Sequence, residues 1–277
     1  MLSFSIRLFR PWHVLLALCV SVFGFVGCDS TQSQRINSLT QADPDEQRNR
    51  ASKRLALASV YFEQEQNEVA QQEVRAALLI DPNYAQAYSL LGLIHQRAQA
   101  PQLAEQSFEQ ALKLASSLPS RPAELADVQH NYAWFLCQQN RFEQAQTQFA
   151  RALSQPGYAQ AGKTWMALGL CQIRAGKFVQ ARNSLAQALA HDAQNPLALY
   201  ELAALDFQEG NPRRAHGFLS SLNASANASA QSLWLGIRLA RALALEQEMQ
   251  SLSLMLQQQF PNSVQARLLA QKNFDQP

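Results

Sequence analysis

The stretch WMALGLCQIRAGKFVQARNSLAQALAH, residues 165–191, decides the fold of this 277-residue chain. Apolar residues recur at helical spacing on both sides of Ala175-Gly176-Lys177, which predicts two short helices joined by a tight turn. Large and small residues alternate within each apolar stripe, with Gly169 in the first helix and Ala181 in the second. One such hairpin cannot bury both of its faces, so we expect similar hairpins on either side of it.

The remainder of the chain supplies these copies. Twelve residues after each small residue of the first five copies comes an alanine, whereas the sixth copy has Glu248 there. Small residues at a helix crossing let two helices approach closely, and the large residues that follow would fill the gap between repeats. The small residues equivalent to Gly169 recur every 33 to 41 residues, at Ala58, Gly92, Ala133, Gly169, Ala203 and Gly236.

This period and pattern resemble the tetratricopeptide repeat. The resemblance implies an all-α fold, a superhelical solenoid of about six helix-turn-helix repeats within residues 51–277. An unrelated helical bundle is the alternative, but a bundle has no reason to keep one such period. The repeats fall near residues 51–84, 85–118, 126–159, 162–195, 196–228 and 229–262, and the last is the most degenerate, as expected of a terminal unit.

Residues 1–27 have the pattern of a targeting segment. Arg7 and Arg10 precede an apolar core, residues 14–26, that is short for a membrane span. A small residue followed by Cys28 resembles a bacterial lipobox, although the two residues before it are atypical. The resemblance implies cleavage before Cys28 and lipid attachment to it, which would anchor the protein stably on a membrane. An ordinary signal peptide or a single-span anchor is the alternative.

Residues 28–50 are polar and carry almost no large apolar side chains, so they cannot join a core. We expect them to form a tether between the lipid and the folded domain. The end of this segment, after Pro44, could enter the first helix. An ordered cap on the solenoid is the alternative.

No pattern in the sequence points to catalysis, a metal or a cofactor. The histidines are far apart, and there is no phosphate-binding or nucleophile motif. Without Arg7 and Arg10, the chain has equal numbers of basic and acidic residues, which argues against nucleic acid as a partner. We therefore predict a non-enzymatic protein that has no metal, no cofactor and no small-molecule substrate.

Cys137 and Cys171 lie on the first helices of adjacent predicted repeats. An oxidising compartment would permit a disulfide between them. We expect Cys137 to face the concave surface and Cys171 to face the packing side. Because their side chains would then diverge, a disulfide is not expected.

The concave surface is the predicted binding site, since the first helix of each repeat would line it. Four positions per repeat point into this groove in the tetratricopeptide family. These positions are apolar or aromatic in the C-terminal half and polar in the first two repeats. An exposed apolar groove favours a partner helix or an extended peptide, although these residues could instead bury one another. The predicted partner-binding residues are Trp134, Met166, Leu170, Ile173, Tyr200, Phe207, Leu233 and Ile237.

A more specific resemblance lies in two stretches. NYAWFL at residues 131–136, followed by QNRFEQA at 139–145, is similar to the third repeat of the PilF/PilW family of type IV pilus biogenesis. AQSLWLGIRLA at 230–240 is similar to the sixth-repeat signature of that family, and FPNS at 260–263 agrees with its ending. Ala133 and Trp134 depart from the two glycines that the family often has there.

The family resemblance implies a pilotin. Such a protein sits by its lipid on the periplasmic face of the outer membrane and helps secretin subunits to localise and assemble into their multimer. The implied partners are type IV pilus secretin subunits and, through the lipid, the membrane. Asp29 resembles an inner-membrane retention signal of enteric bacteria, so the inner membrane remains an alternative location. The alternatives are an envelope lipoprotein that serves another assembly machine, and an enzyme or an accessory domain of one.

Overall fold

The computed structural model describes residues 43–117 and 121–275. The predicted signal peptide and the predicted lipid attachment site Cys28 lie outside these residues. The described residues from Pro44 onward form one compact unit. Every regular element in the described ranges is an α-helix, which confirms the all-α tetratricopeptide fold.

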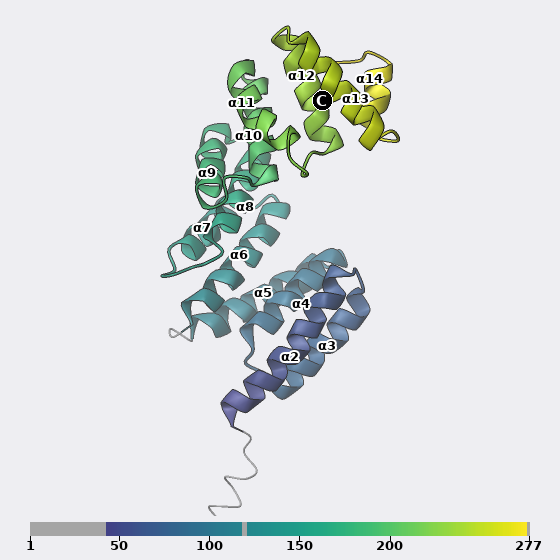
Figure 1. Ribbon diagram of the computed structural model, residues 1–277. Coiled ribbons are helices and arrows are strands. Elements are labelled where there is room, and N and C mark those ends of the chain that lie inside the picture. Colours follow the sequence, from purple (N-terminus) through teal and green to yellow (C-terminus); the bar gives the residue numbers. More distant parts are fainter. Residues whose placement is uncertain (1–42, 118–120, 276–277) are drawn as a thin grey trace, which may run out of the picture. The chain divides into compact units, whose positions relative to one another are not determined.

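The helices form six antiparallel hairpins that follow one another along the chain, and one short helix comes after them (Figure 1). Each hairpin packs against the next, and first helices of neighbouring hairpins also touch at several places. The hairpins are α2 (Pro44–Glu63) with α3 (Asn67–Ile80), α4 (Ala85–Arg97) with α5 (Pro101–Ser116), α6 (Pro122–Gln138) with α7 (Phe142–Leu153), α8 (Ala161–Arg174) with α9 (Phe178–His191), α10 (Pro196–Gln208) with α11 (Pro212–Asn223), and α12 (Ala230–Ala242) with α13 (Glu246–Gln259); the last helix is α14 (Val264–Ala270).

Glycine at the helix crossing is required by the close approach of the two helices of a hairpin. A β-carbon added to Gly169 would lie 2.8 Å from Cδ2 of Leu185, closer than carbon atoms pack without a shift. Leu185 is fully buried, so it has little freedom to move away. The predicted close approach of the two helices at a small residue is therefore confirmed for this hairpin.

The same pattern holds along the solenoid. The alanine twelve residues after the small crossing residue is fully buried in each of the first five repeats. The large residue four positions after that alanine is fully or almost fully buried as well. These residues form the core within and between hairpins. The buried alanines are Ala70, Ala104, Ala145, Ala181 and Ala215, and the large residues are Val74, Phe108, Phe149, Leu185 and Leu219.

Helix α2 begins at Pro44, earlier than the predicted boundary of the folded domain. Arg48 on this helix is paired with Asp81, and its guanidinium lies 4.3 Å from the ring centroid of Tyr84. Residues 44–50 therefore belong to the repeat domain, so the part of the polar segment after Pro44 enters the first helix, which the sequence had left open. The carboxylate and aromatic ring that hold Arg48 lie more than thirty residues away, so the polar local sequence could not reveal them.

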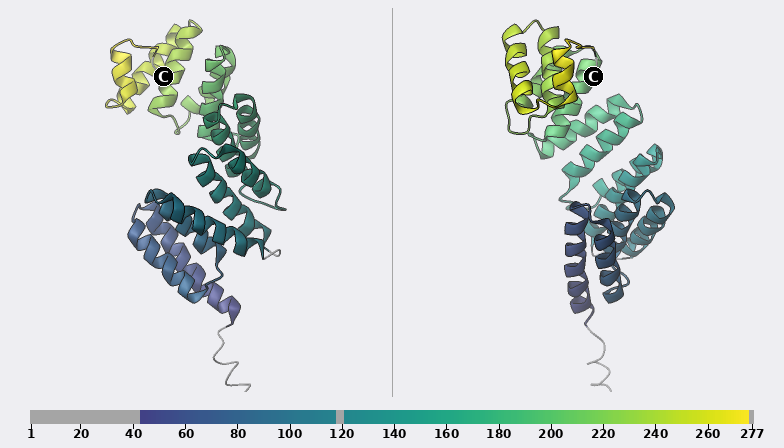
Figure 2. Two further views of the ribbon diagram at one scale, coloured as in Figure 1. Left: turned by 180° about the vertical axis from the view of Figure 1, so that it is seen from behind. Right: turned by 90° about the vertical axis from the view of Figure 1, so that its right-hand side faces the viewer.

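Helix α14 was not predicted, and it packs against α12 and α13 at the end of the repeats (Figures 1 and 2). The hydroxyl of Ser263 accepts a hydrogen bond from the backbone amide of Ala266 at 3.0 Å, which caps the start of the helix. Beyond α14, the Phe274 ring stacks on Trp234 at a centroid distance of 5.7 Å. The chain that follows the sixth hairpin thus covers the side of it that has no further repeat to pack against.

Candidate functional site

Four of the predicted groove residues are half-buried on α6 and α8. Trp134 packs against the core cluster that contains Phe108 and Phe135. Met166 and Ile173 pack against the cluster around Leu185 and Leu202, and Leu170 is half-buried as well. These side chains fill spaces between repeats with part of their surface and leave the remainder exposed. None of these four residues lines either of the two cavities described below.

Tyr200 and Phe207 are brought together in a cavity between α10 and α12. They lie two turns apart on α10, so both face α12, and Ala204 between them leaves room for the hollow. The volume of this cavity is about 360 Å³. Burial raises the pKa of the Tyr200 hydroxyl, so the phenol is neutral at neutral pH. The lining residues are Tyr200, Ala204, Phe207, Gln208, Gln231, Trp234, Leu235, Arg238 and Gln265, and we call this cavity the aromatic pocket.

Leu233 and Ile237 were predicted to line the groove, and that prediction is wrong. Both side chains are 0 % exposed and belong to the core of the sixth hairpin together with Leu256 and Ala266. Ala266 lies on α14, the helix that the sequence prediction lacked. Because α14 packs on α12, the face that is open in earlier repeats is closed here.

Two residues of α12 that the prediction missed, Trp234 and Arg238, line the aromatic pocket instead. Each follows one of the wrongly assigned residues by one position, which is a rotation of about 100° around a helix. The guanidinium carbon of Arg238 lies 5.1 Å from the ring centroid of Phe207. Burial lowers the pKa of Arg238, while Tyr200 and Asp275 act in the opposite direction. A charged residue inside the apolar run LWLGIRLA was the available sequence signal.

A second cavity, of about 440 Å³, lies in the N-terminal half among α2, α4, α6 and the segment before α8. Its lining is largely polar, which agrees with the polar residues expected there. Nδ1 of His130 lies 2.8 Å from Oγ1 of Thr164, which in turn lies 3.1 Å from the Tyr158 hydroxyl. Burial lowers the pKa of His130 to about 4, with a smaller contribution from Lys163. The imidazole is therefore a neutral, structural group and not a proton donor at neutral pH.

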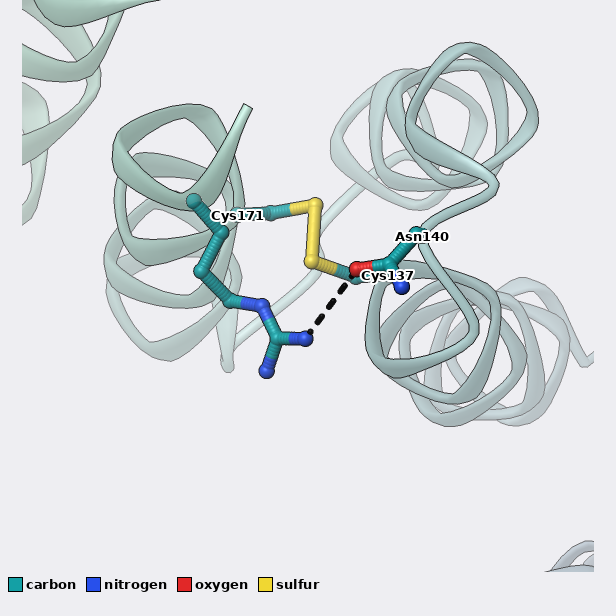
Figure 3. The surroundings of a disulfide bond; sticks show 4 residues. Cys137, Asn140 and Cys171 are labelled. Atoms are coloured by element: carbon teal, nitrogen blue, oxygen red, sulfur yellow. Dashed lines mark hydrogen bonds between the residues drawn. A yellow bond between two sulfur atoms is a disulfide. The ribbon is translucent and has the colours of Figure 1, made fainter. Parts of the chain in front are cut away.

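Cys137 and Cys171 form a disulfide, contrary to the prediction (Figure 3). Their α-carbons lie 5.8 Å apart, a normal separation for a disulfide, and both residues are buried. Cys137 does not face the concave surface as expected but points from α6 to α8. Next to the bond, Arg174 donates a hydrogen bond of 3.4 Å to Oδ1 of Asn140, which also joins the two repeats.

Within the described ranges, no three His, Cys, Asp or Glu side chains are placed to hold a metal ion. In the same ranges, no helix has both the length and the apolar character needed to cross a membrane. The aromatic pocket thus presents apolar, aromatic and guanidinium groups in one concavity.

Comparison with known proteins gives the family. The tetratricopeptide-repeat pattern matches residues 83–155, 136–196 and 172–235. The Pseudomonas aeruginosa type IV pilus assembly protein PilF is 29% identical over 243 residues, which cover 87% of this chain and 92% of PilF. An uncharacterized Haemophilus influenzae protein is 30% identical over 162 residues, or 58% of this chain and 82% of that protein.

Two solved structures share the fold. The structure of Pseudomonas aeruginosa PilF has a TM-score of 0.69 at 27% identity, and the match covers 82% of this chain and 98% of PilF. The crystal structure of PilW, described as a widely conserved type IV pilus biogenesis factor, has the same TM-score at 26% identity and is matched over its full length, with 83% of this chain covered. Sequence and structure agree over nearly the whole repeat domain. The chain belongs to the PilF/PilW-like family of tetratricopeptide-repeat proteins of type IV pilus biogenesis.

Proposed function

We propose that this protein is a lipid-anchored pilotin that helps secretin subunits to localise and to assemble in the outer membrane. The observation that supports this most directly is the aromatic pocket, in a repeat protein whose named relatives serve type IV pilus biogenesis. Tetratricopeptide-repeat proteins bind other proteins, and an apolar concavity on such a solenoid suits a helix or an extended segment. The lipid on Cys28 targets the protein to the membrane, and the repeats bind the secretin subunit.

In this proposal, residues 29–43 are the tether, and the repeat domain starts at Pro44. Tyr200 and Phe207 are the anchors, because large aromatic side chains in a partly enclosed pocket dominate interface energetics. Trp134, Met166, Leu170 and Ile173 extend the contact along α6 and α8 with their exposed surface. Leu233 and Ile237 act only through the core that supports Trp234.

The test compares two double variants in a piliated strain. Y200A/F207A removes the pocket anchors, and L79A/V179A removes two apolar side chains from the second helices α3 and α9, where they are 86% and 74% exposed. We expect Y200A/F207A to reduce secretin multimers on gels at least several-fold while its circular dichroism stays that of the parent. L79A/V179A should leave the multimers unchanged. Normal multimers in Y200A/F207A would show that the pocket does not hold the secretin.

The lipid is tested separately with C28S. We expect the variant to appear in the soluble periplasmic fraction after its signal is removed, and secretin multimers to be lost from the outer membrane. A cleaved C28S protein that still sediments with membranes would contradict the lipid anchor. If secretin is normal but another envelope complex fails in the pocket variant, the protein serves that other assembly machine.

A further inference from the structure

Arg238 is a partly buried cation that forms no salt bridge with any described residue. Its Nε atom is buried and makes no hydrogen bond within the described ranges. Two arginines of the fourth and fifth hairpins, Arg182 and Arg214, behave differently, since both are paired with the buried Asp206. The Phe207 ring and the charge of Asp275 stabilise the cation in part, but the described residues leave the buried Nε donor unsatisfied, which is unfavourable and favours an added acceptor at this guanidinium.

The surroundings of Arg238 are shaped to receive a ligand. The residue lines the aromatic pocket with Tyr200, Phe207 and Trp234. It also lines an adjacent cavity of about 360 Å³, which includes Phe207, Arg241 and Phe274. The aromatic pocket and this adjacent cavity therefore meet at Phe207 and Arg238. In the adjacent cavity Arg241 lies over the Phe274 ring, with its guanidinium carbon 4.5 Å from the ring centroid.

The charges around this junction favour an anion. Two guanidinium groups, those of Arg238 and Arg241, face one lining carboxylate, Asp275. Asp275 is exposed and forms no ion pair with Arg238 within the described ranges, so it does not occupy the guanidinium. A planar guanidinium held against an aromatic ring presents its N–H groups as a fork, which matches a carboxylate in two parallel hydrogen bonds.

We propose that the junction of these two cavities binds an acidic side chain, Asp or Glu, from an internal position of a partner protein segment. A large apolar side chain next to it in the segment lies against Tyr200 and Phe207. This inference rests on the proposed function, since it assigns chemistry to the segment that the aromatic pocket holds. It makes Arg238 the residue that selects which segment of the partner binds.

An internal side chain fits better than a free chain terminus. Capture of a terminal carboxylate uses several converging donors, such as a nest of backbone amides or a set of lysines. Among the residues that the structure describes, Arg238 is the only positively charged one that lines the aromatic pocket; the other polar lining groups are neutral, namely the Tyr200 hydroxyl, the Trp234 indole and the amides of Gln208, Gln231 and Gln265. The apolar lining also favours a bulky apolar side chain next to the acidic one. An acidic residue at an internal position has a neighbour on each side that can supply it.

The experiment uses the full repeat domain with its natural disulfide and two display libraries of random 12-residue peptides. In the first library both peptide ends are fused to carrier, and in the second the C-terminus is free. We expect the first library to yield binders in which Asp or Glu stands one to four residues from Phe, Trp, Tyr, Leu or Ile. Enrichment only from the free-end library would overturn the internal-residue assignment.

One selected peptide is then measured with both ends blocked. Changing its acidic residue to the amide should weaken binding by about tenfold or more, because a charge-assisted pair is lost. R238Q should cause the same loss, R238K should retain part of the binding, and the two changes combined should be no worse than either alone. The matched control is R213Q, which removes an exposed arginine from α11 and should leave binding unchanged.

The outcomes separate this inference from the proposed function. If binding depends on Tyr200 and Phe207 but not on the peptide acid or Arg238, the inference is wrong and the pocket stands. If no selected peptide needs Tyr200 and Phe207 for binding, both this inference and the proposed function of the pocket are wrong. The change of acid to amide in the peptide needs no protein variant, so the test holds even if R238Q folds poorly.

Discussion

Asp206 is wholly buried, and its Oδ2 accepts a hydrogen bond of 2.7 Å from Nε of Arg214. Asp206 lies on α10 and Arg214 on α11, and Arg182 from α9 reaches the same carboxylate. Arg182 extends to Glu209 at 2.7 Å as well. One carboxylate thus joins three helices of the fourth and fifth hairpins. Its charge is balanced by two guanidinium groups that remain partly in solvent.

We expect D206A to destabilise the protein by about 3–5 kcal/mol, because it leaves two arginines facing a buried hollow without their acceptor. Urea unfolding followed by circular dichroism measures this. E209A removes only the more exposed partner of Arg182 and should cost about 1 kcal/mol or less. Equal losses for the two variants would show that burial of Asp206 contributes nothing special.

The crossing of α8 and α9 gives a second prediction with an internal control. G169A places a β-carbon 2.8 Å from Leu185 and should destabilise by about 1–3 kcal/mol through overpacking. G217A adds the same atom in α11, where nothing lies within 4 Å of it, and should stabilise by about 0.5–1 kcal/mol through helix propensity. The opposite signs of the two changes are the result to check, by thermal unfolding of both variants side by side.

The disulfide closes a loop between residues separated by 34 positions in the sequence. Loop-closure entropy predicts that C137A/C171A lowers the free energy of unfolding by about 3–4 kcal/mol. Dithiothreitol should lower the stability of the parent by a similar amount and leave the variant unaffected. A parent whose urea midpoint does not move on verified reduction would contradict this assignment of stability to the bond.

His130 predicts a pH dependence with a defined sign. The pKa of the folded histidine is about 4, against an ordinary value of 6.5, because burial disfavours the charged form. Between pH 6.5 and pH 4 the unfolded chain binds a proton that the folded chain does not, so the free energy of unfolding falls as the pH falls. The loss approaches about 3 kcal/mol and levels off below pH 4.

The measurement compares the parent with H130Q across this pH range by urea unfolding. Asp127 titrates with the opposite sign, since burial raises its pKa, but it is present in both proteins and cancels in the difference. The gap between the two stability curves should therefore narrow as the pH falls from 6.5 to 4. A constant gap would show that His130 titrates normally in the folded protein.

The repeat core could be predicted from the sequence because it depends on local spacing. Gly169 and Leu185 are 16 residues apart in one hairpin, so their contact follows from helix geometry and a short turn alone. Gly176, at φ 72°, also falls where the pattern placed the turn, and it adopts a conformation that glycine reaches without strain. These features need no knowledge of distant residues.

The parts of the site that could not be predicted depend on contacts between hairpins. The side chain of Cys137 can point either into the groove or toward Cys171. The rotation of α6 relative to α8 decides between the two, and the repeat pattern does not determine that rotation. Leu233 and Ile237 are buried because α14 packs on α12, and a seven-residue helix gives little periodic signal. Arg238 lines the pocket and is partly exposed, whereas Trp234 lines its wall as part of the buried core of the sixth hairpin.

The covalent link between the third and fourth hairpins sets how such an array comes apart. In a linear repeat protein, each unit is held only by its neighbours, so fraying starts at an end and travels inward. Fraying from either end would meet the Cys137–Cys171 bond at the centre, where α6 and α8 cannot separate. We therefore expect the oxidised domain to fray as two halves on either side of this bond, with the half that holds the aromatic pocket opening independently of the other.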